Sequence, residues 1–206
     1  MSMLTVEALR YHGYGPIDFT IADGRCMSLT GASGAGKTLL LRAVADLDPH
    51  TGRALLDDVA AAAQPAPAWR RQVAMLPAES AWWHESVGEH FRAAGTADAV
   101  PAERLALLGF TPDVMRWEIA RLSTGERQRL AILRLLAIGP RALLLDEPTA
   151  NLDAPNVSAV ESLIAGFQRD AKAPVLWVTH DPEQRGRVAT QHCRIENGTL
   201  REEPMP

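Results

Sequence analysis

A glycine-rich loop between an apolar strand and a helix is the feature that most constrains the fold of this chain. Residues 31–38 read Gly-Ala-Ser-Gly-Ala-Gly-Lys-Thr and match the phosphate-loop pattern of Gly, four residues, Gly, Lys and then Ser or Thr. An apolar stretch, Cys26–Thr30, precedes the loop, and the apolar residues from Leu39 to Leu47 have helical spacing. Glycines let successive backbone N–H groups turn inward, and the positive end of the helix points the same way. The loop is therefore predicted to bind phosphate.

The loop and the start of its helix supply the candidate nucleotide contacts. These are Gly31, Ala32, Ser33, Gly34, Ala35, Gly36, Lys37, Thr38 and Leu39. We expect the ammonium of Lys37 to neutralise β and γ phosphate oxygens and the hydroxyl of Thr38 to bind Mg²⁺. A flexible turn before a helix is the alternative interpretation, which the strand before the loop and the helix after it disfavour. Many nucleotide-driven machines share this motif, so it leaves open what the energy drives.

A pair of carboxylates follows a second apolar strand. Four aliphatic residues, 142–145, lead directly into Asp146 and Glu147. The carboxyl ends of strands in open α/β sheets hold ligand-contacting groups. We expect Asp146 to bind Mg²⁺ and Glu147 to act as general base for an attacking water or to hold that water in line. An acidic pair on the surface is the alternative, which the buried character of the strand disfavours.

The order of the predicted elements indicates an α/β fold. Strands at 4–9, 17–21, 26–30, 52–58 and 73–76 are predicted in the first part, with a turn at Asp23-Gly24 and a connector at 60–67. Residues 80–121 lack strand signals and are predicted to form a small helical subdomain. Helices at 124–138, 156–170 and 182–189 then alternate with strands at 141–146, 174–178 and 191–196. Such alternation predicts a mainly parallel sheet covered on both faces.

Composition and charge narrow the class of protein. Hydrophobic residues at 47% and charged residues at 22% are ordinary for a soluble globular domain, so the 206 residues are expected to form one domain. The net charge of -4 supplies no broad cationic field, so no nucleic-acid partner is expected. Charges, glycine and proline interrupt the most apolar stretch, 130–145, and no secretory signal is visible, so a cytoplasmic location is predicted. Cys26 and Cys193 are expected to be buried reduced thiols.

Three further segments resemble one family. Residues 122–129, Leu-Ser-Thr-Gly-Glu-Arg-Gln-Arg, resemble the signature motif of the ABC ATPase family. Residues 147–153 resemble its stretch from the catalytic glutamate into the D-loop, and residues 178–181 resemble its switch-histidine strand end. The motifs occur in the family's order. The resemblance implies that residues 1–206 form a P-loop NTPase cassette, with a mainly parallel central sheet, an N-terminal antiparallel β lobe and a helical subdomain at about 80–121.

The resemblance also implies which residues catalyse the reaction. Lys37, Glu147 and His180 become the expected catalytic residues, with ATP as substrate. Thr38 and Asp146 become the expected ligands of Mg²⁺. Taken alone, a histidine after a strand is more often a structural or capping residue, and the family pattern favours a γ-phosphate contact for His180.

The signature motif implies a dimer. In the family this segment reaches the γ-phosphate held by the other subunit, so Ser123, Gly125 and Glu126 are expected to complete a partner's site. The expected active form is a head-to-tail dimer with a second copy or a related cassette, in which Asp153 communicates between subunits. An N-cap with a Ser-x-x-Glu capping box explains Ser123 and Glu126 equally well from local sequence.

Several positions depart from the family or leave a choice. The family commonly stacks adenine on an aromatic residue of the N-terminal strands, and Tyr11 is preferred here over Tyr14. Ala78 replaces the usual glutamine, which removes a contact to magnesium and water, and Glu79 is hypothesised to substitute for it. Residues 82–84, Trp-Trp-His, are expected either to present an aromatic ridge to a membrane partner or to pack inside the helical subdomain.

The full motif set favours an ATP-binding and ATP-hydrolysing subunit of an ABC transporter. Such a subunit would drive a separate membrane-spanning permease and lie on the inner face of the membrane through it. Segments 122–153 and 176–181 look closest to small subunits of the iron-export type. The alternatives are a non-transport ABC ATPase of DNA repair or translation, and a nucleotide-binding regulator without turnover. The coiled-coil insertions of repair relatives and the paired cassettes of translation relatives are not visible in the sequence.

Overall fold

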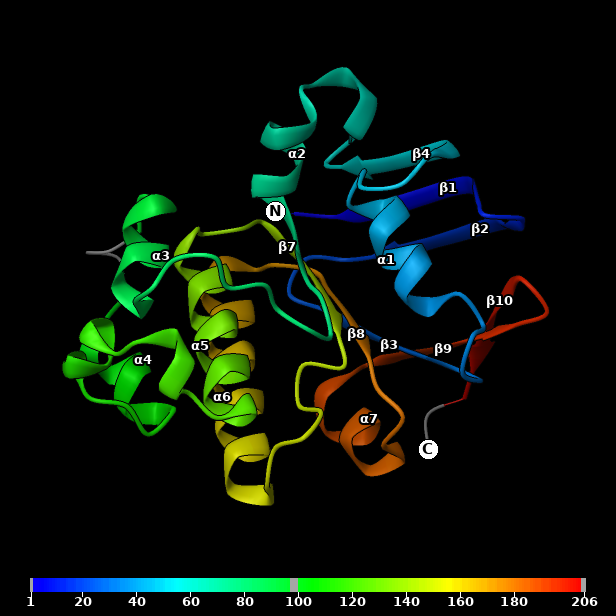
Figure 1. Cartoon of the computed structure of the whole chain (residues 1–206). Helices are drawn as coiled ribbons and strands as arrows, with labels where there is room; N and C mark the ends of the chain where they lie inside the picture. The colour runs from blue at the N-terminus through cyan, green and yellow to red at the C-terminus, as the bar shows by residue number, and fades with distance from the viewer. Residues whose placement is uncertain (1, 97–99, 205–206) are drawn as a thin grey trace.

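Two β-sheets organise the computed structural model, which describes residues 2–96 and 100–204 (Figure 1). Within these residues the larger sheet has six strands in the order β10-β9-β3-β8-β7-β6, and the smaller has four in the order β2-β1-β4-β5. Helix α1 (Lys37–Val44) contacts strands of both sheets, and it lies between them in Figure 1. The structure thus has the mainly parallel central sheet and the N-terminal antiparallel lobe that the sequence predicts.

The larger sheet carries the parallel strands. Its members are β3 (Cys26–Gly31), β6 (Val73–Leu76), β7 (Ala142–Asp146), β8 (Val175–Val178), β9 (Gln191–Glu196) and β10 (Thr199–Glu203). All neighbours are parallel except β9 and β10, which form an antiparallel pair. Because β3, β8 and β7 are adjacent and parallel, the loops that follow them meet at one edge of the sheet.

Strands β7 and β8 are buried on both faces because their side chains alternate between two cores. Leu143, Leu145 and Trp177 belong to one core, whereas Leu144 and Leu176 belong to the other. Each of these side chains is at most 1% exposed. A strand covered on both sides needs apolar residues at every position, which is why the sequence shows continuous apolar runs here.

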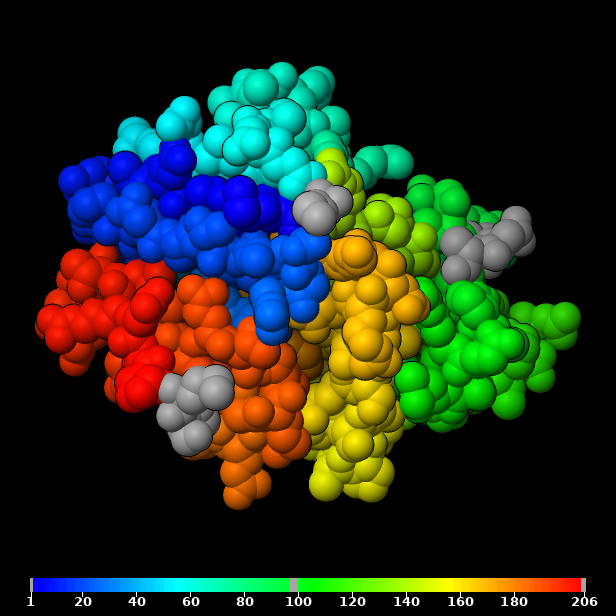
Figure 2. Space-filling view, turned by 180° about the vertical axis from the view of Figure 1, so that it is seen from behind, coloured from blue at the N-terminus to red at the C-terminus, as the bar shows by residue number. Residues whose placement is uncertain are grey.

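The smaller sheet is antiparallel and half-buried. It contains β1 (Leu4–Tyr11), β2 (Tyr14–Ile21), β4 (His50–Leu56) and β5 (Val59–Ala60). Alternate residues of β2, Ile17, Phe19 and Ile21, point into the core with α1, as their period-2 pattern predicts. The turn before β10 lies against β2, where the Gly15 N–H donates to the Gly198 carbonyl over 2.9 Å, and Figure 2 shows the two segments side by side.

Helices cover the other face of the larger sheet. Helices α5 (Thr124–Ala137), α6 (Ala154–Ala171) and α7 (Pro182–Val188) contribute to this layer (Figure 1). Short elements lie outside them: α3 (Val87–Ala93), α4 (Ala102–Leu107), η2 (Pro112–Arg116) and η3 (Ile119–Arg121). Phe91 and Leu105 bring α3 and α4 onto the same core as α5. The predicted helical subdomain includes residues 97–99, which lie outside the described residues.

Three elements are absent from the sequence prediction: strand β5, helix α2 (Ala66–Gln72) and strand β10. A single turn of 3-10 helix, η1 (Ala61–Ala63), lies in the predicted connector. The prolines of the predicted connector in fact start α2, because proline is tolerated in the first turn of a helix. Trp69 anchors this helix, since its fully buried indole N–H donates to the carbonyl of Val44 at the end of α1 over 2.9 Å.

Across residues 2–96 and 100–204, every helix is too short or too polar to cross a bilayer.

The prediction of two buried free thiols is confirmed for Cys26 and Cys193. Burial is the main reason that the pKa of the Cys193 thiol is raised to about 11.

His192 on β9 predicts a fold that loses stability in mild acid. Its Nδ1 lies 2.7 Å from Ser28 Oγ, and burial, assisted by the charge of Arg185, lowers its pKa below the ordinary value of 6.5. The imidazole of His192 therefore binds a proton less readily in the folded state than in the unfolded chain. The neutral His192 contributes its full share of stability above about pH 6.5, and this share is lost as the pH falls below that value.

We expect the free energy of unfolding in urea to fall between pH 8 and pH 5.5, and to fall less in His192→Gln. Part of the fall in the free energy of unfolding is expected to remain in the variant, because burial also lowers the pKa of His90. An equal pH dependence of the two proteins would contradict the assignment to His192.

Candidate functional site

The glycine-rich loop closes the carboxyl edge of the larger sheet. Strand β3 ends at Gly31, and the chain enters α1 at Lys37. Gly31, Gly34 and Gly36 have φ values of +151°, +78° and +93°, which other residues rarely adopt. A Cβ at Gly31 would also lie 2.8 Å from the carbonyl oxygen of Ile195. The loop therefore requires glycine at these positions both for its backbone conformation and for its packing.

Lys37 folds back over this loop. Its Nζ donates to the carbonyls of Gly31 and Ala32 over 2.9 Å and 3.0 Å, and the residue is only 7% exposed. Burial lowers the pKa of its ammonium, and the negative charges of Glu147 and Asp146 oppose that fall. A cation held by carbonyl oxygens inside the ring of the loop is placed to meet an anion there.

An open cavity of about 240 Å³ lies over the loop. It is lined by Ser33, Gly34, Ala35, Gly36, Lys37, Thr38, Leu39, Glu147 and His180. Seven of the nine residues proposed from the sequence as nucleotide contacts thus face one space together with Glu147 and His180. The other two, Gly31 and Ala32, lie at the start of the loop, where their carbonyls hold Lys37.

Thr38 and Asp146 meet beside this cavity. The Thr38 hydroxyl donates to Asp146 Oδ2 over 2.7 Å, and Asp146 at the end of β7 is 3% exposed. Burial raises the pKa of the Asp146 carboxyl, while the hydrogen bond from Thr38 acts in the opposite direction. A hydroxyl and a carboxylate side by side form the kind of oxygen donor set that Mg²⁺ prefers. These two residues therefore fit the metal that the sequence assigns to them.

Glu147 and His180 form a pair at the mouth of the cavity. His180 Nε2 lies 3.0 Å from Glu147 Oε1, and the two side chains are 52% and 36% exposed, respectively. Glu147 has φ +47°, which is uncommon for a residue other than glycine. Its backbone N–H donates to the Val178 carbonyl over 3.1 Å, so the pairing of β7 with β8 brings the two side chains together. A partly exposed carboxylate beside an imidazole is able to take or orient a proton at the cavity.

The signature residues lie elsewhere. Ser123 is exposed at the start of α5, and neither it nor Gly125 nor Glu126 lines the phosphate-loop cavity. Ser123 donates through its backbone N–H and its hydroxyl to Glu126 Oε2, each over 2.8 Å, and Glu126 N–H donates back to Ser123 Oγ over 3.2 Å. These hydrogen bonds lower the pKa of Glu126. Within one chain, the predicted capping box is therefore formed, and Asp153 likewise caps α6 by accepting from the N–H of Asn156.

The preference for Tyr11 as the aromatic platform requires correction. Tyr11 is 2% exposed and its ring stacks on Tyr14 at 5.5 Å, so little of the ring is available to a base, although Tyr11 borders a shallow space beside Tyr14. Tyr14 instead contacts the loop, because its hydroxyl donates to the Gly34 carbonyl over 3.0 Å. A Cβ on Gly36 would lie 3.1 Å from the Tyr14 ring. Tyr14 is thus the aromatic side chain that touches the phosphate loop.

The segment that departs from the family borders a different cavity. Ala78 and Glu79 line a space of about 310 Å³ together with the start of α5 and residues 150–151. Glu79 is exposed and does not line the phosphate-loop cavity beside Thr38. The suggested replacement of a magnesium contact by Glu79 thus has no support in the geometry of the single chain.

Trp82 and Trp83 divide between core and surface. Trp82 packs against the core, whereas Trp83 is 66% exposed. The guanidinium of Arg134 lies 4.4 Å from the ring centre of Trp82 and 5.1 Å from that of Trp83. The backbone N–H groups of Trp83 and His84 both donate to Nε2 of the buried His90, over 2.9 Å and 3.0 Å. The backbone of Trp83 is therefore anchored to His90 while its indole lies at the surface.

Two buried glutamines near the site have no counterpart in the sequence-based predictions. Gln128 on α5 and Gln184 on α7 are 7% and 2% exposed and contact the loop that follows Glu147. Glutamine is usually a surface residue, and only the position of Gln184 in the first turn after Asp181 hints at its place.

Comparisons with known proteins agree with this geometry. A family model described as ABC transporter matches residues 14–150. The Fe(3+) ions import ATP-binding protein FbpC of Mesorhizobium japonicum is 30% identical, with 100% of this chain and 61% of the relative covered. The aliphatic sulfonates import ATP-binding protein SsuB 2 of Frankia alni is 34% identical, with 98% and 81% covered. The chain thus spans about three fifths of the first relative and four fifths of the second.

Solved structures show the same fold. A structure described as the ATP binding subunit of an ABC transporter matches with a TM-score of 0.87 at 22% identity, covering 98% of this chain and 90% of that chain. A bacterial Atm1-family ABC exporter with ATP bound matches with a TM-score of 0.82 at 22% identity, covering 96% of this chain and 37% of that chain.

The two lysines of the chain provide a matched test of the loop. Lys37→Met is expected to lower the affinity for tripolyphosphate by about 10- to 100-fold, because it removes a charged donor from the cavity. Lys172→Met removes the other lysine, which is exposed at the end of α6, and is expected to bind as wild type does. Isothermal titration calorimetry would measure both, and equal losses in the two variants would contradict the assignment.

Proposed function

Because the chain belongs to the ABC transporter family and is similar to its ATP-binding subunits, we propose that it hydrolyses ATP at the phosphate-loop cavity and thereby drives a separate membrane permease. One observation carries this proposal: Lys37, Thr38 and the Glu147–His180 pair line a single cavity, and Asp146 accepts a hydrogen bond from Thr38 beside it. Binding groups for the phosphates, a metal site and a base are thus assembled where ATP would have to react. The whole chain, residues 1–206, serves as one such domain.

The loop binds the triphosphate through charge and backbone donors. Its inward N–H groups and the positive end of α1 favour a phosphate, and Lys37 neutralises its β and γ oxygens. Glu147 accepts a proton from the attacking water or holds that water in line with the γ-phosphorus. His180, 3.0 Å away, keeps the Glu147 carboxylate in place and donates to the γ-phosphate when it turns toward it.

Thr38 and Asp146 would hold Mg²⁺. When bound there, Mg²⁺ neutralises negative charge on the β and γ phosphates. Asp146 is suited to this role because burial makes an isolated carboxylate at its position unfavourable. The hydroxyl of Thr38 donates to one oxygen of this carboxylate, so the two oxygen ligands are already adjacent.

A second copy of the chain completes each site. Ser123 and Gly125 are accessible at the start of α5, a helix of 14 residues, and do not line the cavity of their own chain. In a head-to-tail dimer they would meet the γ-phosphate on the partner's loop, where the positive end of α5 favours an anion. The hydroxyl of Ser123 must then leave the Glu126 carboxylate, to which it donates in the single chain.

The nucleobase has a place beside Tyr14. A shallow space of about 390 Å³ is bordered by Tyr14, His12, His50 and neighbouring residues of the smaller sheet. Tyr14 also contacts the phosphate loop through its hydroxyl, so a base placed in this space would lie near that loop. We place the adenine there, against Tyr14 in preference to Tyr11.

A membrane permease is the proposed partner, docked at the exposed side chain of Trp83. Trp83 is 66% exposed and backed by Arg134, which gives an aromatic surface of the kind enriched at interfaces. The chain would then lie on the inner face of the membrane through the permease. The named relatives import cargoes as different as iron and sulfonates, so the proposal is transport in general, and the likeness to iron-export subunits stays a prediction from sequence.

Removing the base tests the proposal. Glu147→Gln is expected to lower magnesium-dependent ATP hydrolysis by about 100- to 1,000-fold, because the amide cannot accept the proton of water. Size-exclusion chromatography in ATP is expected to show the variant as a persistent dimer.

The control is Glu103→Gln, an exposed carboxylate on α4, which is expected to hydrolyse ATP as wild type does. Unchanged hydrolysis by Glu147→Gln would refute its role. A wild-type protein that binds ATP but neither hydrolyses it nor dimerises would favour the regulator alternative.

A further inference from the structure

We propose that Gln184 is a positioning residue that holds Glu147 beside His180 by fixing the neighbouring Thr149. The inference rests on the proposed function, because it concerns the hydrolytic role of Glu147. It starts from the backbone of Glu147, whose φ of +47° is unfavourable for a residue with a side chain. Such a conformation persists only where surrounding contacts enforce it. The residues that enforce it therefore influence where the Glu147 carboxylate lies.

Gln184 supplies one set of these contacts. Its Nε2 donates to Thr149 Oγ1 over 2.9 Å and to Glu161 Oε1 over 2.9 Å, and its backbone N–H donates to Asp181 Oδ1 over 3.2 Å. The side chain is 2% exposed and lines a cavity of about 290 Å³ together with Glu147 and His180. One side chain thus joins the loop after Glu147 to the helix that follows His180.

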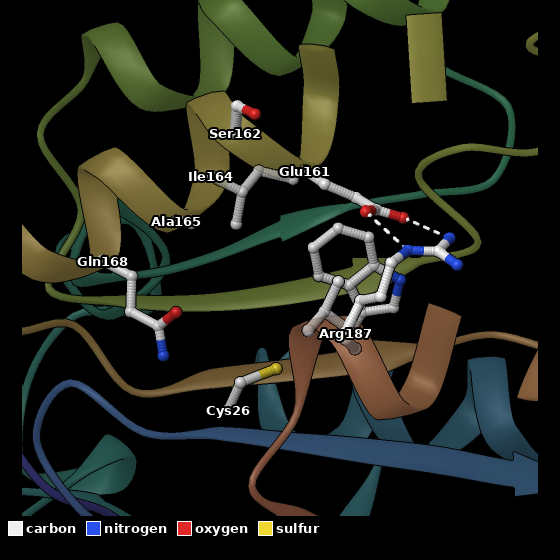
Figure 3. Close-up of a pocket in the computed structure, with 9 residues that line it drawn as sticks. Cys26, Glu161, Ser162, Ile164, Ala165, Gln168 and Arg187 are labelled. Carbon is white, nitrogen blue, oxygen red and sulfur yellow. Dashed lines mark hydrogen bonds and ion pairs between the residues drawn. The ribbon is translucent and has the colours of Figure 1, made fainter. Parts of the chain in front are cut away.

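An ion pair fixes the direction in which the Gln184 amide points. Glu161 on α6 accepts from Arg187 Nε and Nη2 over 3.0 Å and 2.9 Å (Figure 3). Burial works against the charged form of Glu161, but the hydrogen bonds from Arg187 and Gln184 keep its pKa below the ordinary value. A charged carboxylate only accepts, so the NH₂ end of the amide must face Glu161. The Thr149 hydroxyl, which accepts from Nε2, also lies 3.2 Å from the carbonyl oxygen of the amide, to which it is able to donate.

A second glutamine holds the same loop from the other side. Gln128 on α5 donates through Nε2 to the carbonyl of Pro148 over 3.2 Å and is 7% exposed. The two residues that follow Glu147 are therefore each bonded to a buried glutamine, one from α5 and one from α7. Gln184 does not line the phosphate-loop cavity, so its loss should leave nucleotide binding intact while it disturbs Glu147.

The test is a double-mutant cycle on ATP hydrolysis. Gln184→Leu keeps most of the side-chain volume and removes the hydrogen bonds to Thr149. It is expected to lower kcat by about 10- to 100-fold, because the Glu147 carboxylate would no longer be held in position to accept the proton. The Kd for a fluorescent ATP analogue is expected to change by less than about two-fold. In the Glu147→Gln background the same change is expected to lower the residual rate by less than about two-fold, since the base is already absent.

If Gln184→Leu fails to fold, Thr149→Val replaces it in the same double-mutant cycle. This variant removes the hydroxyl that bonds to Gln184 and leaves Gln184 and Glu161 intact. Gln168→Leu is the matched control, because Gln168 on α6 lines the cavity of Figure 3 rather than the loop after Glu147. Its rate is expected to equal that of wild type.

Two results would overturn the inference: no fall in kcat in either variant, or an equal fold-loss with and without Glu147, which indicates a general structural defect. A wild-type protein that hydrolyses no ATP would instead overturn the proposed function, and this inference with it.

Discussion

Strands β3, β8 and β7 pair in parallel and are buried on both faces, so the carboxyl edge of the sheet is where polar groups that follow them reach solvent. This arrangement brings together parts of the chain that are far apart in sequence. Thr38 follows β3, and His180 follows β8. Asp146 is the last residue of β7, and Glu147 comes directly after it. The apolar cores on the two sides of the sheet therefore determine the geometry of the polar site, and the distances of 2.7 Å and 3.0 Å within its two pairs depend on that packing.

The same burial sets the electrostatics of the site. It lowers the pKa of Lys37 and raises that of Asp146, so each charge is unfavourable taken alone, and each is supported by the opposite charge nearby. Glu147 adds backbone strain at φ +47°. The folded chain thus holds several groups in unfavourable conformations and environments. Proteins commonly keep such strained groups where they react, and the surrounding hydrogen bonds maintain them.

The sequence predicts those parts of the fold that depend on local patterns. Strand β6 is found at the predicted residues, because four apolar residues precede Pro77, and the capping box of Ser123 and Glu126 follows from their spacing. Strand β10 was not predicted because its residues are mostly exposed and show no apolar pattern. Tyr11 and Tyr14 sit on adjacent strands, and local sequence does not show that Tyr11 is buried while the Tyr14 hydroxyl reaches the phosphate loop. The burial of Gln184 depends on α6 and α7 packing together, which no local pattern reveals.

We propose that each ATP site is shared between two copies of the chain. Mixing Lys37→Met protein with Ser123→Arg protein, each purified separately, tests this claim through the rate of ATP hydrolysis. In a head-to-tail dimer, a mixed pair has one intact site, formed by the loop of one variant and the α5 start of the other. Each variant alone is expected to be inactive. An equal mixture is expected to regain about a quarter of the wild-type rate, since about half the dimers are mixed and each mixed dimer has one intact site of two. A mixture no more active than its components, or a Ser123→Arg protein as active as wild type, would contradict the shared site.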